Sequence, residues 1–271
     1  MSSSLLYPGE IIIDEDTPNH ILDALGIGFG TGWVKNESDG YGVAADDFPD
    51  GMLLPEQEIK DRIKEREANK NQLSHKMIAK GIPCKNQEDT WFCYVNAVAH
   101  CLEVMGVMAN QPYVPLSAAS VACQINGFTK YCGGFAGKAL SVIQGIGILP
   151  EEYWPANSVD RSYNTKENWK KAVNYIVAKW CSLEPGNILQ MASLNVQDIP
   201  GGVAYQWWPR GAHEVTSYDA IILDGEIAFR DRNSWGMQWT GGVNGFFIVR
   251  GQHARFDDGV ACLSIGTGLA V

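Results

Sequence analysis

Four residues whose side chains suit amide hydrolysis follow one another along the chain: Gln87, Cys93, His213 and Asn233. An amide is a poor electrophile with a poor leaving group. Its hydrolysis therefore needs an activated nucleophile, an acid for the departing amine and hydrogen-bond donors for the oxyanion. Cys93 precedes a helix-forming run at 95–99. A thiol at the start of a helix has a lowered pKa because it feels the positive end of the helix dipole. The sequence therefore predicts a cysteine nucleophile.

Three local sequences surround these residues and occur in a recognisable order. Gln87 lies six positions before Cys93, a Cys-Gly-Gly-Phe segment follows at 132–135, and an Asn-Ser-Trp-Gly segment follows at 233–236. The set resembles the papain family of cysteine proteases: the Asn-Ser-Trp-Gly motif is unaltered, and the family's Cys-Asn-Gly-Gly segment is shortened by one residue. The resemblance covers about residues 75 to 250, with every motif in the expected order.

The resemblance implies a role for each catalytic residue. Cys93 attacks as a thiolate held in an ion pair with His213, the general acid and base. Asn233 accepts the other imidazole proton and orients the ring, and Trp235 shields that hydrogen bond from water. Gln87 donates its side-chain amide to the oxyanion, beside the Cys93 backbone N–H. Loss of such a donor typically costs about 2.7 to 4 kcal/mol of transition-state stabilisation.

The same comparison predicts the residues that contact substrate. Gly133 and Gly134 line the substrate cleft in the family pattern. Trp91 stands where relatives have a glycine beside the thiol, so its indole is expected to narrow or fill the cleft. Glu214 replaces a small residue that borders the S2 pocket. A carboxylate there either selects a basic or polar side chain at the second substrate residue before the scissile bond, or raises the cost of binding an apolar one.

The fold class expected from the resemblance is α+β, with a helical lobe and an antiparallel, barrel-like β lobe. We expect an N-terminal extension over 1–65, irregular and then the start of a helix, and a papain-like domain over 66–271. Within that domain the helical lobe spans about 84–182, the β lobe about 183–255 and a C-terminal tail 256–271. Apolar spacing predicts helices at 116–123, 137–144 and 166–180, and strands at 11–13, 203–207, 220–223, 227–229 and 246–249.

Composition excludes several classes of protein. A hydrophobic content of 45% with nine Trp and ten Tyr excludes a disordered chain. A formal net charge of −10 argues against nucleic-acid binding, which needs clustered Lys and Arg. We find neither a secretory signal in the first ten residues nor an apolar run long enough to span a bilayer, and we expect a cytoplasmic protein without membrane contact. No cofactor motif occurs.

The seven cysteines indicate a reducing compartment. No Cys-x-x-Cys pair occurs among them, so we expect no metal site. Extracellular members of the papain family bridge a cysteine three positions before the nucleophile to the cysteine of the Cys-Asn-Gly-Gly segment. In this chain the first of these positions is Thr90, so Cys132 lacks the partner that the resemblance implies.

Three functions fit these observations. The first is an intracellular cysteine peptidase acting on polypeptides. The second is a weak or inactive papain-fold protein that serves as a structural component of a larger assembly such as a virus particle. The third keeps the same catalytic residues for acyl transfer or deamidation. Residues 1–54, which are acidic and rich in glycine, are either a self-inhibitory plug in the cleft or an arm that binds an assembly partner.

Overall fold

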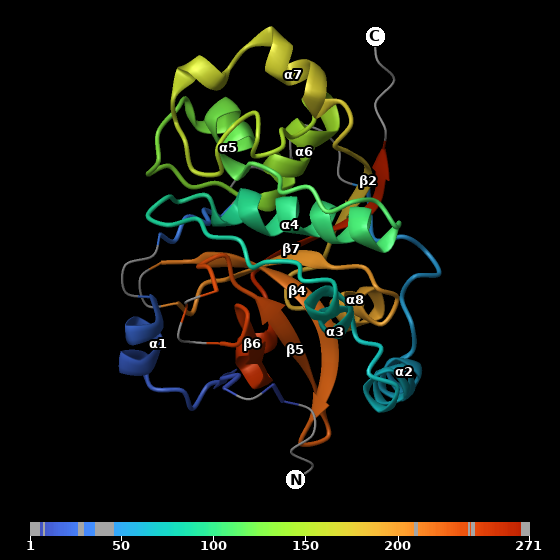
Figure 1. The fold of residues 1–271 in the computed structure, drawn as a ribbon. Coiled ribbons are helices and arrows are strands. Elements are labelled where there is room, and N and C mark those ends of the chain that lie inside the picture. The colour runs from blue at the N-terminus through green and yellow to red at the C-terminus, as the bar shows by residue number, and fades with distance from the viewer. Residues whose placement is uncertain are drawn as a thin grey trace.

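A computed structural model describes residues 6–7, 9–26, 30–35, 46–208, 211–237, 239 and 242–266 of the 271-residue chain. Its centre is helix α4 (Cys93–Met108), which lies between a β-sheet and a group of helices (Figure 1). That group contains α5 (Ala118–Asn126), α6 (Ala136–Ile146) and α7 (Lys166–Ala172). Nearly every side chain of α4 is buried, because the helix packs against both layers.

The described strands form one seven-stranded sheet in the order β1-β6-β5-β4-β3-β7-β2. Neighbouring strands are antiparallel except β1 and β6, which are parallel. The strands are β1 (Ile12–Ile13), β2 (Ile176–Ser182), β3 (Gly201–Tyr205), β4 (His213–Leu223), β5 (Glu226–Arg232), β6 (Phe246–Val249) and β7 (Asp258–Gly266). The α+β class is confirmed, but the sheet is open: β1 and β2 are its edges, and the strands do not close into a barrel.

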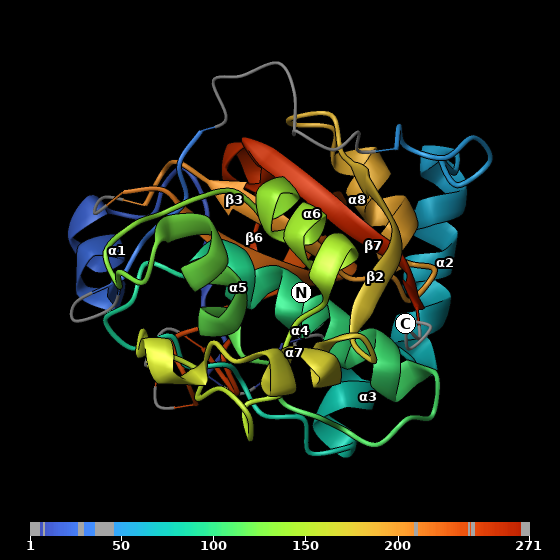
Figure 2. The same cartoon turned by 90° about the horizontal axis from the view of Figure 1, so that it is seen from above.

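Four further helices cover the sheet. They are α1 (Asn19–Gly26), α2 (Glu56–Ala68), α3 (Leu73–Ala79) and α8 (Ile188–Asn195), with 3-10 turns at Arg161–Tyr163 and Gly251–Ala254. Figures 1 and 2 both place α1 and α2 on opposite sides of the molecule. Seen from above, α6 lies along β7 and β2, so these strands connect the helical group to the sheet (Figure 2).

Two expectations from local sequence patterns are wrong. The apolar pattern at 166–180 predicted one helix, but α7 ends at Ala172 and β2 begins at Ile176. The β-branched Ile176 and Val177 suit a strand, and pairing with β7 decides the outcome. The segment at 256–271, expected to be a tail, contains β7, which lies between β3 and β2. Pairing between segments distant in sequence leaves no local signal.

The N-terminal residues are built into the sheet edge. β1 pairs with β6, as expected for a strand at 11–13. The carboxylate of Glu10 receives hydrogen bonds of 2.7 and 3.0 Å from Arg230 of β5, and both side chains are fully buried. A further ion pair of 2.8 Å joins Asp14 to Arg250. Residues 10–14 are therefore firmly attached to the β layer.

The Glu10–Arg230 pair allows a stability test. Removal of one partner from a buried ion pair leaves an uncompensated charge, so we expect Glu10→Ala to lower the free energy of unfolding by about 3 to 5 kcal/mol. The matched control Glu226→Ala removes an exposed carboxylate and should change it by less than about 0.5 kcal/mol. Urea unfolding followed by circular dichroism measures both. Equal effects of the two substitutions would contradict a stabilising role for the buried pair.

Candidate active site

Cys93 is the first residue of α4 and is fully buried. Backbone N–H groups of Glu214 and Gly32 lie within hydrogen-bonding reach of its sulfur. Glu214 belongs to β4, whereas Gly32 belongs to the N-terminal part of the chain. The candidate nucleophile therefore lies where the start of a helix, the start of a strand and a distant segment meet.

His213, the first residue of β4, is held by Asn233. Its Nε2 lies 2.8 Å from Asn233 Oδ1. An amide oxygen only accepts hydrogen bonds, so this contact places a proton on Nε2 and leaves Nδ1 as a base. Among the described residues, Nδ1 has no hydrogen-bond partner although it is buried. The N–H of the next residue, Glu214, reaches the sulfur of Cys93, so His213 directly precedes a residue that contacts the candidate nucleophile. His213 Nδ1 makes no hydrogen bond to Cys93.

Tryptophan rings shield the His213–Asn233 hydrogen bond. Trp235 stacks on the imidazole with ring centroids 4.4 Å apart and an interplanar angle of 23°. Trp208 meets both rings edge-on, and Trp239 packs on Trp235. Water exclusion strengthens the hydrogen bond, and the packing restricts rotation of the imidazole.

Gln87 is positioned by a short pairing of 85–87 with 234–236. Its N–H donates to Ser234 O at 2.8 Å, and its Oε1 accepts from Ser234 Oγ at 2.5 Å. The Oε1 contact orients Nε2, which donates to the carbonyl oxygen of Gly30 at 2.7 Å. The indole N–H of Trp235 donates to the same oxygen at 3.3 Å. The donor predicted for an oxyanion therefore already binds a carbonyl oxygen.

That oxygen belongs to residues 30–34, which we call the covering segment. Gly134 N–H donates to Gly32 O at 2.8 Å, and Val34 N–H donates to Gly134 O at 2.9 Å, so the segment pairs with Gly134 in parallel. On the other side, Trp33 N–H donates to Ala212 O at 3.2 Å. The segment thus binds by main-chain hydrogen bonds, as an extended peptide does.

Close backbone approach requires glycine in this contact. A Cβ atom on Gly32 would lie 2.0 Å from the carbonyl oxygen of Trp91, and one on Gly133 would lie 2.0 Å from Gly32 O. No side chain fits at such distances. The predicted contact residues Gly133 and Gly134 therefore do bind a peptide segment, although that segment comes from the chain itself.

Two main-chain groups of the covering segment have identified partners in the site. The backbone N–H of Gly32 faces the sulfur of Cys93, and the Gly30 carbonyl oxygen accepts hydrogen bonds from Gln87 and Trp235. An amide nitrogen is not an electrophile, so the Gly32 N–H contact offers the sulfur nothing to attack.

Burial gives the catalytic pair its protonation state. It raises the pKa of Cys93 to about 12, and the nearby Glu214 carboxylate acts in the same direction. Burial also lowers the pKa of His213 to about 4, although the Asn233 hydrogen bond opposes the shift. With the covering segment in place, burial thus favours the neutral thiol and the neutral imidazole over the thiolate–imidazolium pair expected from the resemblance, because both charges would be desolvated.

Trp91 and Glu214 lie in contrasting environments. The Trp91 side chain is 41% exposed and meets Tyr131 edge-on, so its indole is not buried in the site. Its backbone carbonyl and its Cβ atom both lie close to Gly32 of the covering segment. Glu214 is 1% exposed, and burial and the charge of Asp258 raise its pKa well above the usual value, against a hydrogen bond from Ala136 N–H.

Sequence reasoning missed the individual residues of the covering segment and also Asp258, which accepts a hydrogen bond from the Trp33 indole at 3.2 Å. The available signal was the Gly30-Thr31-Gly32 alternation in an otherwise acidic extension, since alternate glycines permit close backbone contact. For Asp258 no signal existed, because only strand pairing brings it to the site.

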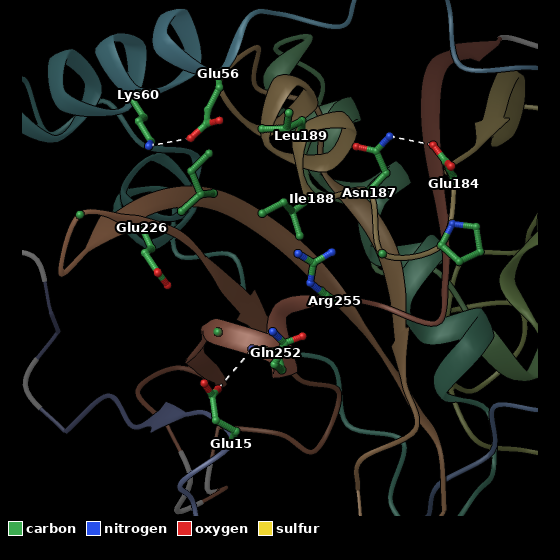
Figure 3. A pocket seen from close by; sticks show the side chains of 15 residues that line it. Glu15, Glu56, Lys60, Glu184, Asn187, Ile188, Leu189, Glu226, Gln252 and Arg255 are labelled. Carbon is green, nitrogen blue, oxygen red and sulfur yellow. Dashed lines mark hydrogen bonds and ion pairs between the residues drawn. The ribbon is translucent and has the colours of Figure 1, made fainter.

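Other features lie away from this site. A hollow of about 870 Å³ is lined by residues of α2, α8 and β5, among them Glu56, Lys60, Ile188 and Glu226, and by Arg255 after the 3-10 turn at Gly251–Ala254 (Figure 3). Cys93 and His213 do not line it. Within the described part of the chain, we find no cluster of three metal-binding side chains and no helix long and apolar enough to cross a membrane.

Solved structures with the same architecture are known. Xylellain, a cysteine protease from Xylella fastidiosa, is 16% identical, with a TM-score of 0.58 over 86% of this chain and 95% of its own. Procathepsin B S9 from Trypanosoma congolense is 15% identical, with a TM-score of 0.60 over 88% and 87% of the two chains. Digestive procathepsin L 3 of Tenebrio molitor is 17% identical, with a TM-score of 0.56 over 67% and 66%. No family model and no curated protein matches the sequence.

The chain has the papain-like fold. At these identities the comparison establishes architecture, and it confirms the fold expected from the sequence motifs. In this papain-like fold, α4 presents Cys93 to the sheet and β4 presents His213 to α4. The chemistry available there must be argued from the side chains themselves.

Thiol alkylation tests the covered state. Since only the thiolate reacts and the pKa of Cys93 is about 12, we expect slow iodoacetamide labelling that rises about tenfold per pH unit between about pH 6 and pH 9. Gly32→Ala places a methyl group against Trp91 O and should displace the segment, giving faster labelling with a flatter pH dependence. Mass spectrometry of the peptide containing Cys93 provides the rates.

The matched control is Gly145→Ala, a substitution near the end of α6 where an added Cβ meets no atom within 4 Å. It should label at the rate of the unmodified protein. If Gly145→Ala and Gly32→Ala accelerate labelling equally, the covering segment is not what protects Cys93.

Proposed function

We propose that this protein is a latent cysteine peptidase that hydrolyses peptide bonds once the covering segment leaves the site. Nδ1 of His213 takes the thiol proton, and the sulfur of Cys93 attacks the substrate carbonyl carbon. Gln87 Nε2 and the Cys93 backbone N–H donate to the resulting oxyanion. The imidazolium then protonates the leaving amine, and water hydrolyses the thioester with His213 as its base.

One observation carries the proposal: a peptide segment is bound at the site by the groups that peptide hydrolysis requires. Gly134 exchanges two main-chain hydrogen bonds with it, and Gln87 donates to its carbonyl oxygen. A site that binds an extended backbone beside a thiol, with an amide donor aimed at a carbonyl oxygen, suits acyl transfer from peptides.

Two further observations favour an enzyme over a structural papain-fold protein. His213 is oriented by Asn233, and its buried Nδ1 has no hydrogen-bond partner among the described residues. A buried nitrogen without a partner lowers stability, so a purely structural role does not account for it. The Trp91 side chain is 41% exposed, so it is not buried in the site. The same residues also suit transfer of the acyl group to an amine, which product analysis distinguishes from hydrolysis.

The covering segment lies between two parts of the chain that are attached to the sheet, and we propose that these attachments maintain latency. Before it, Glu10 and β1 bind β5 and β6. After it, Asp46 pairs with Cys181, and its carbonyl oxygen accepts from Ser182 N–H at 3.3 Å. Opening therefore displaces residues 30–34 locally. A deletion of 1–54 would remove part of the sheet and confuse loss of inhibition with loss of folding.

We also propose that the protein works in a reducing compartment. All seven cysteines are free thiols in the structure. Thr90 stands where the papain-family resemblance implies the cysteine that would pair with Cys132. A reducing environment preserves the Cys93 thiol for catalysis.

Peptide hydrolysis by an opened variant tests the function. We expect Gly32→Ala and, independently, Trp33→Ala to cleave a quenched fluorescent peptide library at least about tenfold faster than the unmodified protein, because each weakens binding of the covering segment. Adding Cys93→Ala should abolish cleavage, and adding Gln87→Ala should lower kcat about 10²- to 10³-fold by removal of an oxyanion donor.

The exposed Val34 supplies a matched control on the same segment, since Val34→Ala should leave latency unchanged. Absence of cleavage by both opened variants, with Cys93 shown by alkylation to be accessible, would refute the peptidase function. Cleavage that survives Cys93→Ala would refute the proposed nucleophile.

A further inference from the structure

Two carboxylates flank one small residue beside Cys93. Ala204 of β3 pairs with Glu214 of β4 on one side and with Asp258 of β7 on the other. Residues directly opposite each other on neighbouring strands project from the same face of a sheet. The three side chains therefore form a row, acid, alanine, acid, on the face that packs against Cys93.

The indole of Trp33 occupies this row. It packs with Cys93 and Ala204, and Phe135 and Ala212 border it. Its Nε1 donates to Asp258 Oδ2 at 3.2 Å. Trp33 is the residue that pairs with Gly134, so a substrate strand bound to Gly134 places a side chain at the same position. We call this position the Trp33 site.

Glu214 is the carboxylate of this row that has one oxygen without a hydrogen-bond partner among the described residues. Its side chain is 1% exposed, and its Oε2 has no hydrogen-bond partner among the described residues. Its carboxylate lies near Gly202 and receives a hydrogen bond from Ala136 N–H. A buried carboxyl oxygen without a partner is unfavourable, and a ligand that supplies a donor removes the penalty. The Trp33 indole has one N–H, which donates to Asp258, so it offers no hydrogen bond to Glu214 Oε2.

We propose that the Trp33 site selects a basic substrate side chain, arginine above all. This inference rests on the peptidase function proposed above. Arginine has an apolar stem that can replace the indole against Ala204, and a planar guanidinium with five N–H donors that can serve both Asp258 and Glu214. Leucine or phenylalanine would fill the space and offer no donor to the buried Glu214 Oε2.

Substrate profiling of the Gly32→Ala variant tests the selectivity. Each residue on the amino-terminal side of the scissile bond is varied in turn in a fluorogenic peptide library. We expect one position at which arginine exceeds phenylalanine and leucine in kcat/KM by about tenfold to a hundredfold. Glu214→Gln and Asp258→Asn, which keep size and remove charge, should each reduce that ratio about tenfold, whereas Glu226→Gln, a distant exposed carboxylate, should not alter it.

A second measurement uses the covering segment as the ligand and needs no turnover. In the otherwise unmodified protein, Trp33→Arg should protect Cys93 from iodoacetamide at least about tenfold better than Trp33→Leu, because only arginine can pair with both carboxylates. Cleavage with a preference for apolar residues at every position would overturn the arginine assignment and leave the peptidase function standing. Without any cleavage, the peptidase function fails, and faster labelling of Trp33→Arg than of Trp33→Leu would overturn the basic site as well.

Discussion

The hydrogen bond from His213 Nε2 to Asn233 Oδ1 is the interaction on which the site depends. It places the imidazole proton on Nε2 and leaves the buried Nδ1 without a hydrogen-bond partner among the described residues. Trp235 maintains the bond by stacking on the ring and excluding water. The strand pairing of β4 with β5 positions both partners, since His213 begins β4 and Asn233 directly follows β5.

The covering segment binds to hydrogen-bonding groups of this site and shifts the pKa values of Cys93 and His213 by burying them. It satisfies Gln87 and Gly134 with main-chain groups, and it buries Cys93 so thoroughly that the neutral forms of thiol and imidazole are favoured. In the proposed latent peptidase, inhibition by this segment therefore has a steric and an electrostatic component. Departure of the segment would readmit water and restore the conditions in which the helix dipole and His213 stabilise a thiolate.

Local patterns predicted several helices and strands at about their observed positions. The helices at 116–123 and 137–144 correspond to α5 and α6, and the strand patterns at 203–207 and 246–249 to β3 and β6. They failed at 166–180, where apolar spacing fits a helix and a strand equally and only pairing with β7 decides. The tail expected at 256–271 was wrong because β7 pairs with β2 and β3, which lie far from it in sequence and leave no local mark in that segment.

The sequence by itself determined the identities and order of Gln87, Cys93, His213 and Asn233, because each lies in a motif short enough to be read locally. It also indicated the carboxylate at Glu214. Only the tertiary structure decided that residues 30–34 cover the sulfur, that Trp91 points to solvent, and that Asp258 joins Glu214 across Ala204. These relations depend on main-chain pairing between segments up to about two hundred residues apart, which no local pattern of residue types records.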